Sequence, residues 1–290
     1  FSTIAITAQR AWSPTSVSGL SVNYVQGGYR MRSPFRALDD DAYTTACVED
    51  LVQVFDMMTS GDVAAMIAEP IQGVGGFAVP PDGFFGEMKK ELDNRGVLFI
   101  SDEVQTGWGR TGDNFWGYQA HGITPDILTF AKGVGNGLAL GGVVASAELM
   151  NSLPGNSLST FGGNPLSSAG ALATIRYMLD NDLQGNSKKM GARLEAILRP
   201  AADACQSVGE LRGRGLMLAF EMVRPGTNEP DADAAARLLE AARARGVLIG
   251  KGGLYGNVLR IAPPMTVTPD EIDKAGEIIV AALGSLTDAG

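Results

Sequence analysis

Histidine is almost missing from this sequence, and cysteine is scarce: 290 residues hold one histidine, His121, and two cysteines, Cys47 and Cys205. A single histidine argues against a histidine-dependent catalytic triad and against a multi-histidine metal site. Its neighbours predict a loop around it. The cysteines lie far apart and share no CxxC or Cys/His spacing, so neither a disulfide framework nor a zinc site is expected. We expect two buried thiols and no metal ion.

Basic clusters and long apolar runs are also missing. The net charge is -9, which disfavours a surface that binds nucleic acid or anionic lipid. No apolar stretch reaches the roughly 18 residues of a membrane span, and the first residues do not resemble a signal peptide. We expect small-molecule ligands, no nucleic-acid or membrane partner, and a location in the cytoplasm, or in an organelle matrix if a targeting peptide has been removed. The first residue is Phe1 and not Met, so we expect that an N-terminal portion is absent.

Strand and helix patterns alternate between residues 63 and 150. Four apolar stretches, at 62–70, 97–103, 126–133 and 141–149, are separated by a helical segment at 82–96 or by loops. Strands that are apolar throughout are typical of a mainly parallel sheet with helices on both faces, and hence of an α/β fold. Glu69, Asp102 and Lys132 each fall at the carboxyl end of one stretch. Open α/β sheets bind their ligands at that edge.

The pattern changes after residue 186. Helices are predicted at 164–182 and 186–205, followed by a strand-like stretch at 209–223, an amphipathic helix at 231–246, and short strands at 247–250 and 257–264. A helix at 267–286 closes the chain, with Thr268 at its N-cap and Glu271 completing a capping box. We predict a large cofactor-binding domain at residues 1–186 and a smaller α+β domain at residues 187–290.

Lys132 and Asp102 together suggest a carbonyl cofactor. Desolvation lowers the pKa of a buried lysine, and the neutral amine attacks aldehydes. A nearby aspartate suits pyridoxal phosphate, whose pyridine nitrogen it would keep protonated. Raising that nitrogen's pKa by about two units needs roughly 2.7 kcal/mol, which an exposed aspartate could hardly supply. Taken singly, Asp102 could cap a turn and Lys132 could be a solvated loop lysine; their convergence on one sheet edge favours the cofactor site.

Other glycine-rich cofactor motifs do not fit. The sequence contains no GxxxxGK[ST] phosphate loop, and "GVGNGLALGG" places Leu138 where a dinucleotide motif needs its third glycine. The segments "AEPIQGVGGF", "LFISDEVQTGWGRTG", "PDILTFAKGVGNGLALGGVV" and "STFGGNPLSSAGALA" instead resemble, in this order, the class III (omega) aminotransferases of PLP-transferase fold type I. The resemblance covers essentially the whole chain. "EPIQGVGG" and "GKGGLYGNVLRIAPPM" are most similar to the alanine–glyoxylate aminotransferase 2 group.

This resemblance implies a pyridoxal 5′-phosphate site. Lys132 would form the Schiff base with the cofactor and shuttle the proton, and Asp102 would pair with the pyridine nitrogen. Val104 would pack on one face of the ring, and Gln105 would bond the ring's phenolic oxygen. Glu69 would belong to the hydrogen-bond network beneath the cofactor. The implied reaction moves an amino group from an amino acid, alanine or an omega-amino acid, to an oxo acid such as glyoxylate or pyruvate by a ping-pong mechanism.

The resemblance also implies a homodimer with shared active sites. Thr160 matches a threonine that reaches across the dimer interface to the cofactor phosphate, although it could equally be an ordinary turn residue. Arg260 matches the arginine that binds a substrate carboxylate; the alternative is a surface arginine on an edge strand. Val74 stands where the 4-aminobutyrate and acetylornithine enzymes carry a glutamate that can hold this arginine away, which counts against those two assignments. The family's phosphate-binding turn and stacking aromatic would precede Phe1.

Two other functions remain open at this stage. An aminomutase or racemase would keep Lys132 and Asp102 but would not consume a separate oxo acid. A binding protein of the same fold could have lost catalysis.

Overall fold

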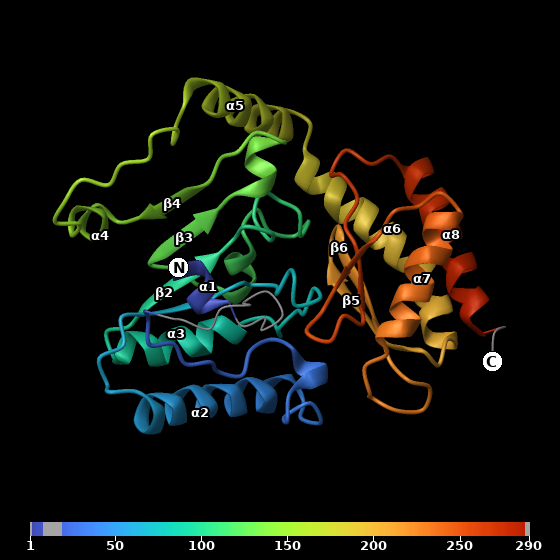
Figure 1. The fold of residues 1–290 in the computed structure, drawn as a ribbon, viewed down its shortest axis with the longest axis horizontal. Coiled ribbons are helices and arrows are strands. Elements are labelled where there is room, and N and C mark those ends of the chain that lie inside the picture. The colour runs from blue at the N-terminus through green and yellow to red at the C-terminus, as the bar shows by residue number, and fades with distance from the viewer. Residues whose placement is uncertain (1, 8–18, 288–290) are drawn as a thin grey trace.

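The computed structural model describes residues 2–7 and 19–287, which form two four-stranded sheets with helices around them (Figure 1). The helices are α1 (Ser2–Ile6), α2 (Asp40–Met58), α3 (Phe84–Asn94), α4 (Ala147–Asn151), α5 (Pro165–Asp180), α6 (Leu183–Ala204), α7 (Ala232–Ala244) and α8 (Pro269–Thr287). Short 3-10 helices are η2 (Arg30–Arg32), η3 (Gly117–His121) and η4 (Lys132–Gly135). No helix in these two described ranges is long and apolar enough to cross a membrane.

The first sheet has the predicted parallel character. Its strands are β1 (Ala65–Ala68), β2 (Leu98–Asp102), β3 (Ile127–Phe130) and β4 (Gly142–Ala145), in the spatial order β1-β2-β3-β4. β1, β2 and β3 run parallel, and β4 pairs antiparallel with β3. The mainly parallel sheet is therefore confirmed, and the carboxyl ends of β1, β2 and β3 lie at one edge.

Helices cover this sheet less completely than the apolar strands predict. α3 contacts both α2 and β2, and the core between them contains Tyr43, Phe84 and Phe99. The side chains of Ile67, Val143 and Val144 are nevertheless 40%, 55% and 57% exposed. The prediction of helices on both faces is therefore only partly met by the described residues.

The second sheet is antiparallel and lies against α6 and α7, and α8 packs on these two helices (Figure 1). Its strands are β5 (Val208–Arg214), β6 (Met217–Met222), β7 (Gly250–Gly252) and β8 (Val258–Ile261), in the order β5-β6-β8-β7. The stretch at 209–223 is thus a hairpin, because the chain turns at Gly215, whose φ of 53° favours glycine. The strand predicted at 247–250 is also shifted and covers only 250–252.

The closing helix begins as its sequence predicts. The Thr268 hydroxyl accepts a hydrogen bond from the Glu271 amide at 3.4 Å, and the Glu271 carboxylate accepts one from the Thr268 amide at 2.8 Å. This confirms the capping box. The predicted domain boundary, at residues 186 and 187, falls in the first turn of α6, which packs on α8. The division into two domains stays a prediction.

Both thiols are buried, as expected, but His121 does not lie in an exposed loop. It ends η3, is only 6% exposed and packs edge-on against the ring of Phe85 at 4.9 Å. Burial, reinforced by the positive charge of Arg214, lowers the pKa of His121 to about 4, while Asp82 opposes the shift. The folded protein therefore keeps this imidazole neutral in mildly acidic solution.

Stability should fall between pH 6.5 and pH 4 because of His121. The unfolded chain protonates the imidazole near pH 6.5 and the folded chain near pH 4, so the unfolded state binds more protons in this window. At pH 5 the loss from this group should be about 2 kcal/mol relative to pH 7.5. Denaturant unfolding at both pH values measures it. The His121→Gln variant should lack this component; an equal pH dependence in both proteins would contradict the assignment.

Candidate active site

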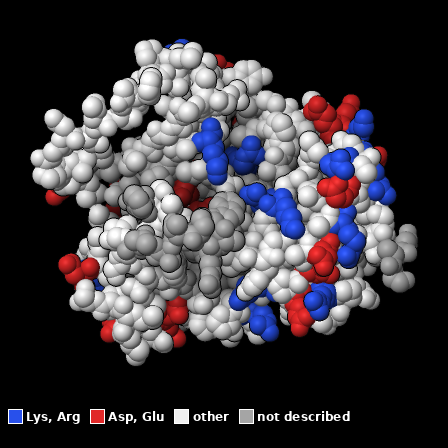
Figure 2. All heavy atoms as spheres, in the orientation of Figure 1, with Lys and Arg blue, Asp and Glu red and all other residues white. Residues whose placement is uncertain are grey.

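Three charged residues meet at the carboxyl edge of the first sheet. Glu69 directly follows β1, Asp102 ends β2, and Lys132 follows β3 by two residues. The strands are in parallel register, with Ala68 opposite Ser101 and Asp102 opposite Thr129, so their ends lie side by side. Figure 2 shows a hollow below the segment that carries α4 and α5, with acidic side chains inside it and basic side chains beside it. The sequence correctly placed all three residues at one edge.

The backbone of Lys132 has a conformation that residues other than glycine rarely adopt. Its φ is 48°, in the left-handed region, and it begins η4 next to Gly133. Its side chain is exposed, yet desolvation by the surrounding protein lowers its pKa; the negative charges of Glu69 and Asp102 oppose this shift, and Arg260 adds to it. A lysine amine that loses its proton more readily is a better nucleophile toward a carbonyl carbon.

Glu69 links this amine to the neighbouring loop. Its carboxylate accepts a hydrogen bond from the Gly73 amide at 2.8 Å. Burial raises the pKa of Glu69, and the negative charge of Asp102 adds to this shift. The hydrogen bond from Gly73 and the positive charges of Lys132 and Arg260 oppose it. Glu69, Asp102, Lys132 and Arg260 therefore act on one another electrostatically although they come from four separate segments.

Asp102 also caps a turn, as the simpler alternative from the sequence proposed. Its Oδ1 accepts a hydrogen bond from the Val104 amide at 3.1 Å. A carboxylate has two oxygens and about four acceptor positions, so this bond leaves capacity for a further donor. Capping a turn and binding a cationic ring nitrogen are therefore compatible roles for Asp102.

Glu103 points to the other side of the chain from Asp102 and is fully buried. Its carboxylate accepts hydrogen bonds from the hydroxyls of Ser101 and Thr106 at 3.0 and 2.5 Å, and from the amides of Gly117 and Tyr118 at 2.8 Å each. Four donors satisfy this buried charge without a cation. Glu103 thus fixes the loop that follows β2. The only sign of this role in the sequence is the pair of adjacent carboxylates after an apolar strand.

Replacing Glu103 with glutamine should lower the free energy of unfolding by about 2 kcal/mol, because an amide NH2 group would face donors that now bind a charged oxygen. Urea unfolding at pH 7 measures the change. Glu87→Gln is the matched control: Glu87 lies on the exposed face of α3 and pairs with Lys90, so its loss should cost less than about 1 kcal/mol. Equal effects of the two substitutions would show that the buried network contributes nothing.

Arg260 lies on an inner strand, because β8 pairs with both β6 and β7. This excludes the alternative of an edge-strand arginine. The neighbouring Leu259 and Ile261 are buried on the opposite face, as alternation predicts. The guanidinium donates to the carbonyl oxygens of Gly73 at 3.3 Å and Lys251 at 3.4 Å. Both bonds are long and go to neutral acceptors, and no carboxylate within residues 2–7 and 19–287 forms an ion pair with Arg260.

The surroundings of Arg260 suit an anionic group. Its guanidinium lies 5.6 Å from the centre of the Phe77 ring, and its buried Nε has no hydrogen-bond partner among the described residues. Arg260, Phe77 and Gln105 line a cavity of about 390 Å³ that also reaches α6 and α8. Gln105 packs tightly on Gly73, where an added Cβ would come within 2.1 Å of its amide nitrogen. Arg260 and Gln105 therefore share one cavity.

Thr160 lies apart from these residues. It is exposed in the connection between α4 and α5, and none of the hydrogen bonds within the described ranges joins it to Lys132, Asp102 or Arg260. Its predicted contact with the cofactor of a second copy stays a prediction. No group of three or more His, Cys, Asp or Glu residues in the part of the chain that the structure describes is arranged to hold a metal ion.

The residues at the sheet edge fit pyridoxal phosphate. The cofactor needs an amine of lowered pKa for its aldehyde carbon and an anion for its ring nitrogen. Lys132 has the first property, and Asp102 supplies a carboxylate with free acceptor capacity. The charge of each acts on the other residues of the group. The donor set therefore matches the requirements of this cofactor.

Comparison with known proteins points to the same chemistry. A family model described as aminotransferase class-III matches residues 6–283. The chain is 38% identical over 273 residues to alanine–glyoxylate aminotransferase 2 homolog 2, mitochondrial, of Arabidopsis thaliana, covering 93% of this chain and 56% of that protein. It is 41% identical over 224 residues to 4-aminobutyrate aminotransferase of Mycobacterium leprae, covering 77% and 50%. The chain thus spans about half the length of these relatives.

A solved structure shares the fold. An amine transaminase from an uncultivated Pseudomonas species, in a PLP-bound form, superposes with a TM-score of 0.83 at 32% identity, covering 90% of this chain and 61% of that chain.

Proposed function

This chain belongs to the class III aminotransferase family, and we propose that it transfers an amino group from an amino acid to an oxo acid with pyridoxal 5′-phosphate as cofactor. The proposed donor is alanine or an omega-amino acid, and the proposed acceptor is glyoxylate or pyruvate. The observation that carries the proposal is the meeting of Lys132, Asp102 and Glu69 at the carboxyl edge of the first sheet. Arg260, from β8 of the second sheet, is close enough for its charge to act on Glu69 and Lys132.

Five residues would hold the cofactor. Lys132 would bind its aldehyde carbon, and Asp102 would bind its ring nitrogen. Val104, which follows the Asp102 turn, would cover one ring face, and Gln105 would donate to the phenolic oxygen. Glu69 would complete the network from the loop side. When bound, pyridoxal phosphate supplies an electron-withdrawing ring that weakens the bonds to the substrate's Cα.

Lys132 would also act as the general base and acid. Once released from the aldehyde carbon, its Nζ would take the proton from the substrate's Cα. It would then donate this proton to another atom on the same side of the bound substrate. The lowered pKa of Lys132 favours this role, because a base works best when its pKa lies near the working pH. The two stages would then run as a ping-pong exchange, with the oxo acid leaving before the acceptor binds.

Arg260 would bind the substrate carboxylate. Its planar guanidinium can donate two parallel hydrogen bonds to a carboxylate, and its present acceptors are long bonds to carbonyl oxygens. Val74 cannot form an ion pair with it, which supports alanine over 4-aminobutyrate as donor. The identity to the M. leprae 4-aminobutyrate aminotransferase makes 4-aminobutyrate the first alternative donor to assay.

The rest of the proposal concerns assembly, domains and location. Two copies would share their active sites, with Thr160 of each serving the cofactor of the other. The cofactor would lie in the large domain, residues 1–186, next to the small domain, residues 187–290. A cytoplasmic or organelle-matrix location is part of the proposal, and the Arabidopsis relative carries "mitochondrial" in its name.

An absorbance experiment tests the reaction. The full-length protein with bound pyridoxal phosphate is treated with L-alanine and then with glyoxylate, while pyruvate and glycine are quantified. The visible band of the bound cofactor should disappear with alanine, return with glyoxylate, and accompany equimolar pyruvate and glycine. Formation of D-alanine without pyruvate would identify a racemase, and a rearranged amino acid an aminomutase. A protein that never acquires the band would be a binding protein of this fold.

A further inference from the structure

The loop at residues 73–77 contacts two of the candidate site residues. The Gly73 amide donates to the Glu69 carboxylate at 2.8 Å, and the Gly73 carbonyl accepts from Arg260 at 3.3 Å. The ring of Phe77, at the other end of the loop, lies 5.6 Å from the Arg260 guanidinium. The position of this loop therefore sets where the Arg260 side chain rests.

Arg212 of β5 holds this loop from the second sheet. Its side chain is only 7% exposed, and its Nε and Nη2 both donate to the Gly76 carbonyl, at 3.0 and 2.8 Å. These bonds are shorter than the 3.3 Å bond between Arg260 and Gly73. A Cβ at Gly76 would come within 2.9 Å of Val258 and 3.1 Å of Arg212, and the φ there is +108°. The contact therefore depends on glycine at position 76 and on a forked donor at position 212.

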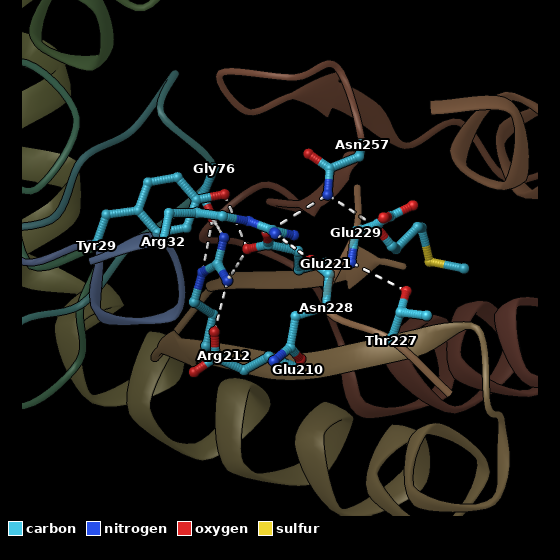
Figure 3. A network of polar contacts seen from close by, with 11 residues as sticks. Tyr29, Arg32, Gly76, Glu210, Arg212, Glu221, Thr227, Asn228, Glu229 and Asn257 are labelled. Carbon is cyan, nitrogen blue, oxygen red and sulfur yellow. Dashed lines mark hydrogen bonds and ion pairs between the residues drawn. The ribbon is translucent and has the colours of Figure 1, made fainter. Parts of the chain in front are cut away.

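A buried carboxylate fixes Arg212 in turn (Figure 3). Glu221 of β6 is fully buried and pairs with Arg212 at 2.5 Å. It also accepts from the Tyr29 hydroxyl at 2.8 Å and from the Nε of Arg32 at 2.6 Å. Burial alone would raise the pKa of Glu221, but the charge of Arg212 and the hydrogen bonds hold it below its usual range. Arg212 is thus oriented by Glu221 from one side and binds the loop on the other.

We propose that Arg212 is a positioning residue for substrate carboxylates: by holding the Gly76 carbonyl it fixes the 73–77 loop, and the loop fixes the guanidinium of Arg260. The Gly253 amide, which donates to the Val74 carbonyl at 2.9 Å, is a second anchor, but it lies on backbone and cannot be removed by substitution without changing the turn. The inference rests on the proposed function only in taking Arg260 as the carboxylate-binding residue. It assigns Arg212 no contact with substrate or cofactor.

The Arg212→Lys variant tests this. Lysine keeps the positive charge beside Glu221, but its single ammonium group cannot reproduce the forked pair of bonds to Gly76. In the full-length protein with bound pyridoxal phosphate, the dissociation constant of propionate, followed by cofactor absorbance, should rise about tenfold. The KM for L-alanine should rise by a similar factor, while kcat changes less than about threefold. The dissociation constant of pyridoxal phosphate should not change.

Two controls separate positioning from loss of stability. Arg32→Lys weakens the same buried network, since Arg32 binds Glu221. Among the residues that the structure describes, no hydrogen bond or ion pair joins Arg32 to the 73–77 loop. It should lower the melting temperature and leave propionate binding unchanged. Arg193→Lys alters an exposed pair with Asp273 in the same half of the molecule and should change neither quantity.

The outcomes of these measurements either support or overturn the proposed role of Arg212. An unchanged propionate constant in Arg212→Lys, or an equal rise in Arg32→Lys, would overturn the inference. If wild-type protein binds propionate but does not exchange amino groups, the proposed function fails while the inference remains testable by binding. If Arg212→Lys does not fold, Glu210→Gln replaces it. Glu210 is 41% exposed and accepts a hydrogen bond from Nη1 of Arg212, so the dissociation constant of propionate should rise about twofold in this variant. No rise would overturn the inference.

Discussion

Replacing Lys132 with alanine should lower the rate of amino transfer from L-alanine to glyoxylate by about 10⁴-fold or more. The substitution would remove both the amine proposed to bind the cofactor's aldehyde carbon and the group proposed to move the proton at the substrate's Cα. No other lysine lies in the group formed by Glu69, Asp102 and Arg260, among the residues the structure describes. Single-turnover absorbance changes and product analysis measure the loss, and the visible band of the bound cofactor should shift in the variant.

The surface pair of Lys188 and Asp113 supplies the control for this experiment. These side chains are 66% and 55% exposed, and their charged atoms lie 2.7 Å apart. Lys188→Ala should retain wild-type rates. If Lys132→Ala kept more than about a hundredth of the wild-type rate, a different base would have to be sought.

Replacing Asp102 with asparagine should lower kcat about a hundredfold, with a smaller change in the KM for L-alanine. The carboxylate would support the protonated ring nitrogen by roughly 2.7 kcal/mol, which corresponds to two factors of ten. The amide oxygen of asparagine can still accept from the Val104 amide, as Oδ1 of Asp102 does, so the turn after β2 should persist. The variant thus separates the charge of this residue from its role as a cap.

Steady-state kinetics and a thermal melt together measure the effect of Asp102→Asn. Asp113→Asn, at the surface pair described above, is its control and should leave kcat unchanged. A fall in kcat with an unchanged melting temperature would support the assigned role. A variant with wild-type kcat would show that the ring nitrogen is supported by another group, and that Asp102 acts only in the turn.

Local sequence patterns predicted much of the fold. Apolar strands, capping residues and helical spacing predicted β1, β2, β3, α3 and α5 to α8 close to their observed bounds. The capping box of α8 could be foreseen because both partners lie within four residues of each other. The hairpin of β5 and β6 was missed because strand character continues across the turn, and only Gly215 marks it. The shift of β7 has a similar origin, since an edge strand of three residues has little pattern of its own.

Composition and residue order narrow the chemistry to be expected at this site. One histidine and two separated cysteines argue against the usual triads and zinc sites, and carboxylates and a lysine directly after apolar strands must collect at one sheet edge once the strands run parallel. Asp102, Glu69 and Lys132 are therefore readable from order along the chain alone, because register in a parallel sheet is set by local hydrophobic pattern. The roles proposed for them come from the resemblance to the family.

Contacts between distant segments determine which of these charges find hydrogen-bond partners among the described residues. Glu103 neighbours Asp102 in sequence, yet it is enclosed by four donors that arrive from residues up to Tyr118. Arg212 and Gly76 are 136 residues apart, and no local pattern links them. Such contacts depend on how the two sheets pack, so long-range packing alone distinguishes the enclosed carboxylate of Glu103 from that of Asp102, and the arginine that binds the Gly76 carbonyl from Arg260.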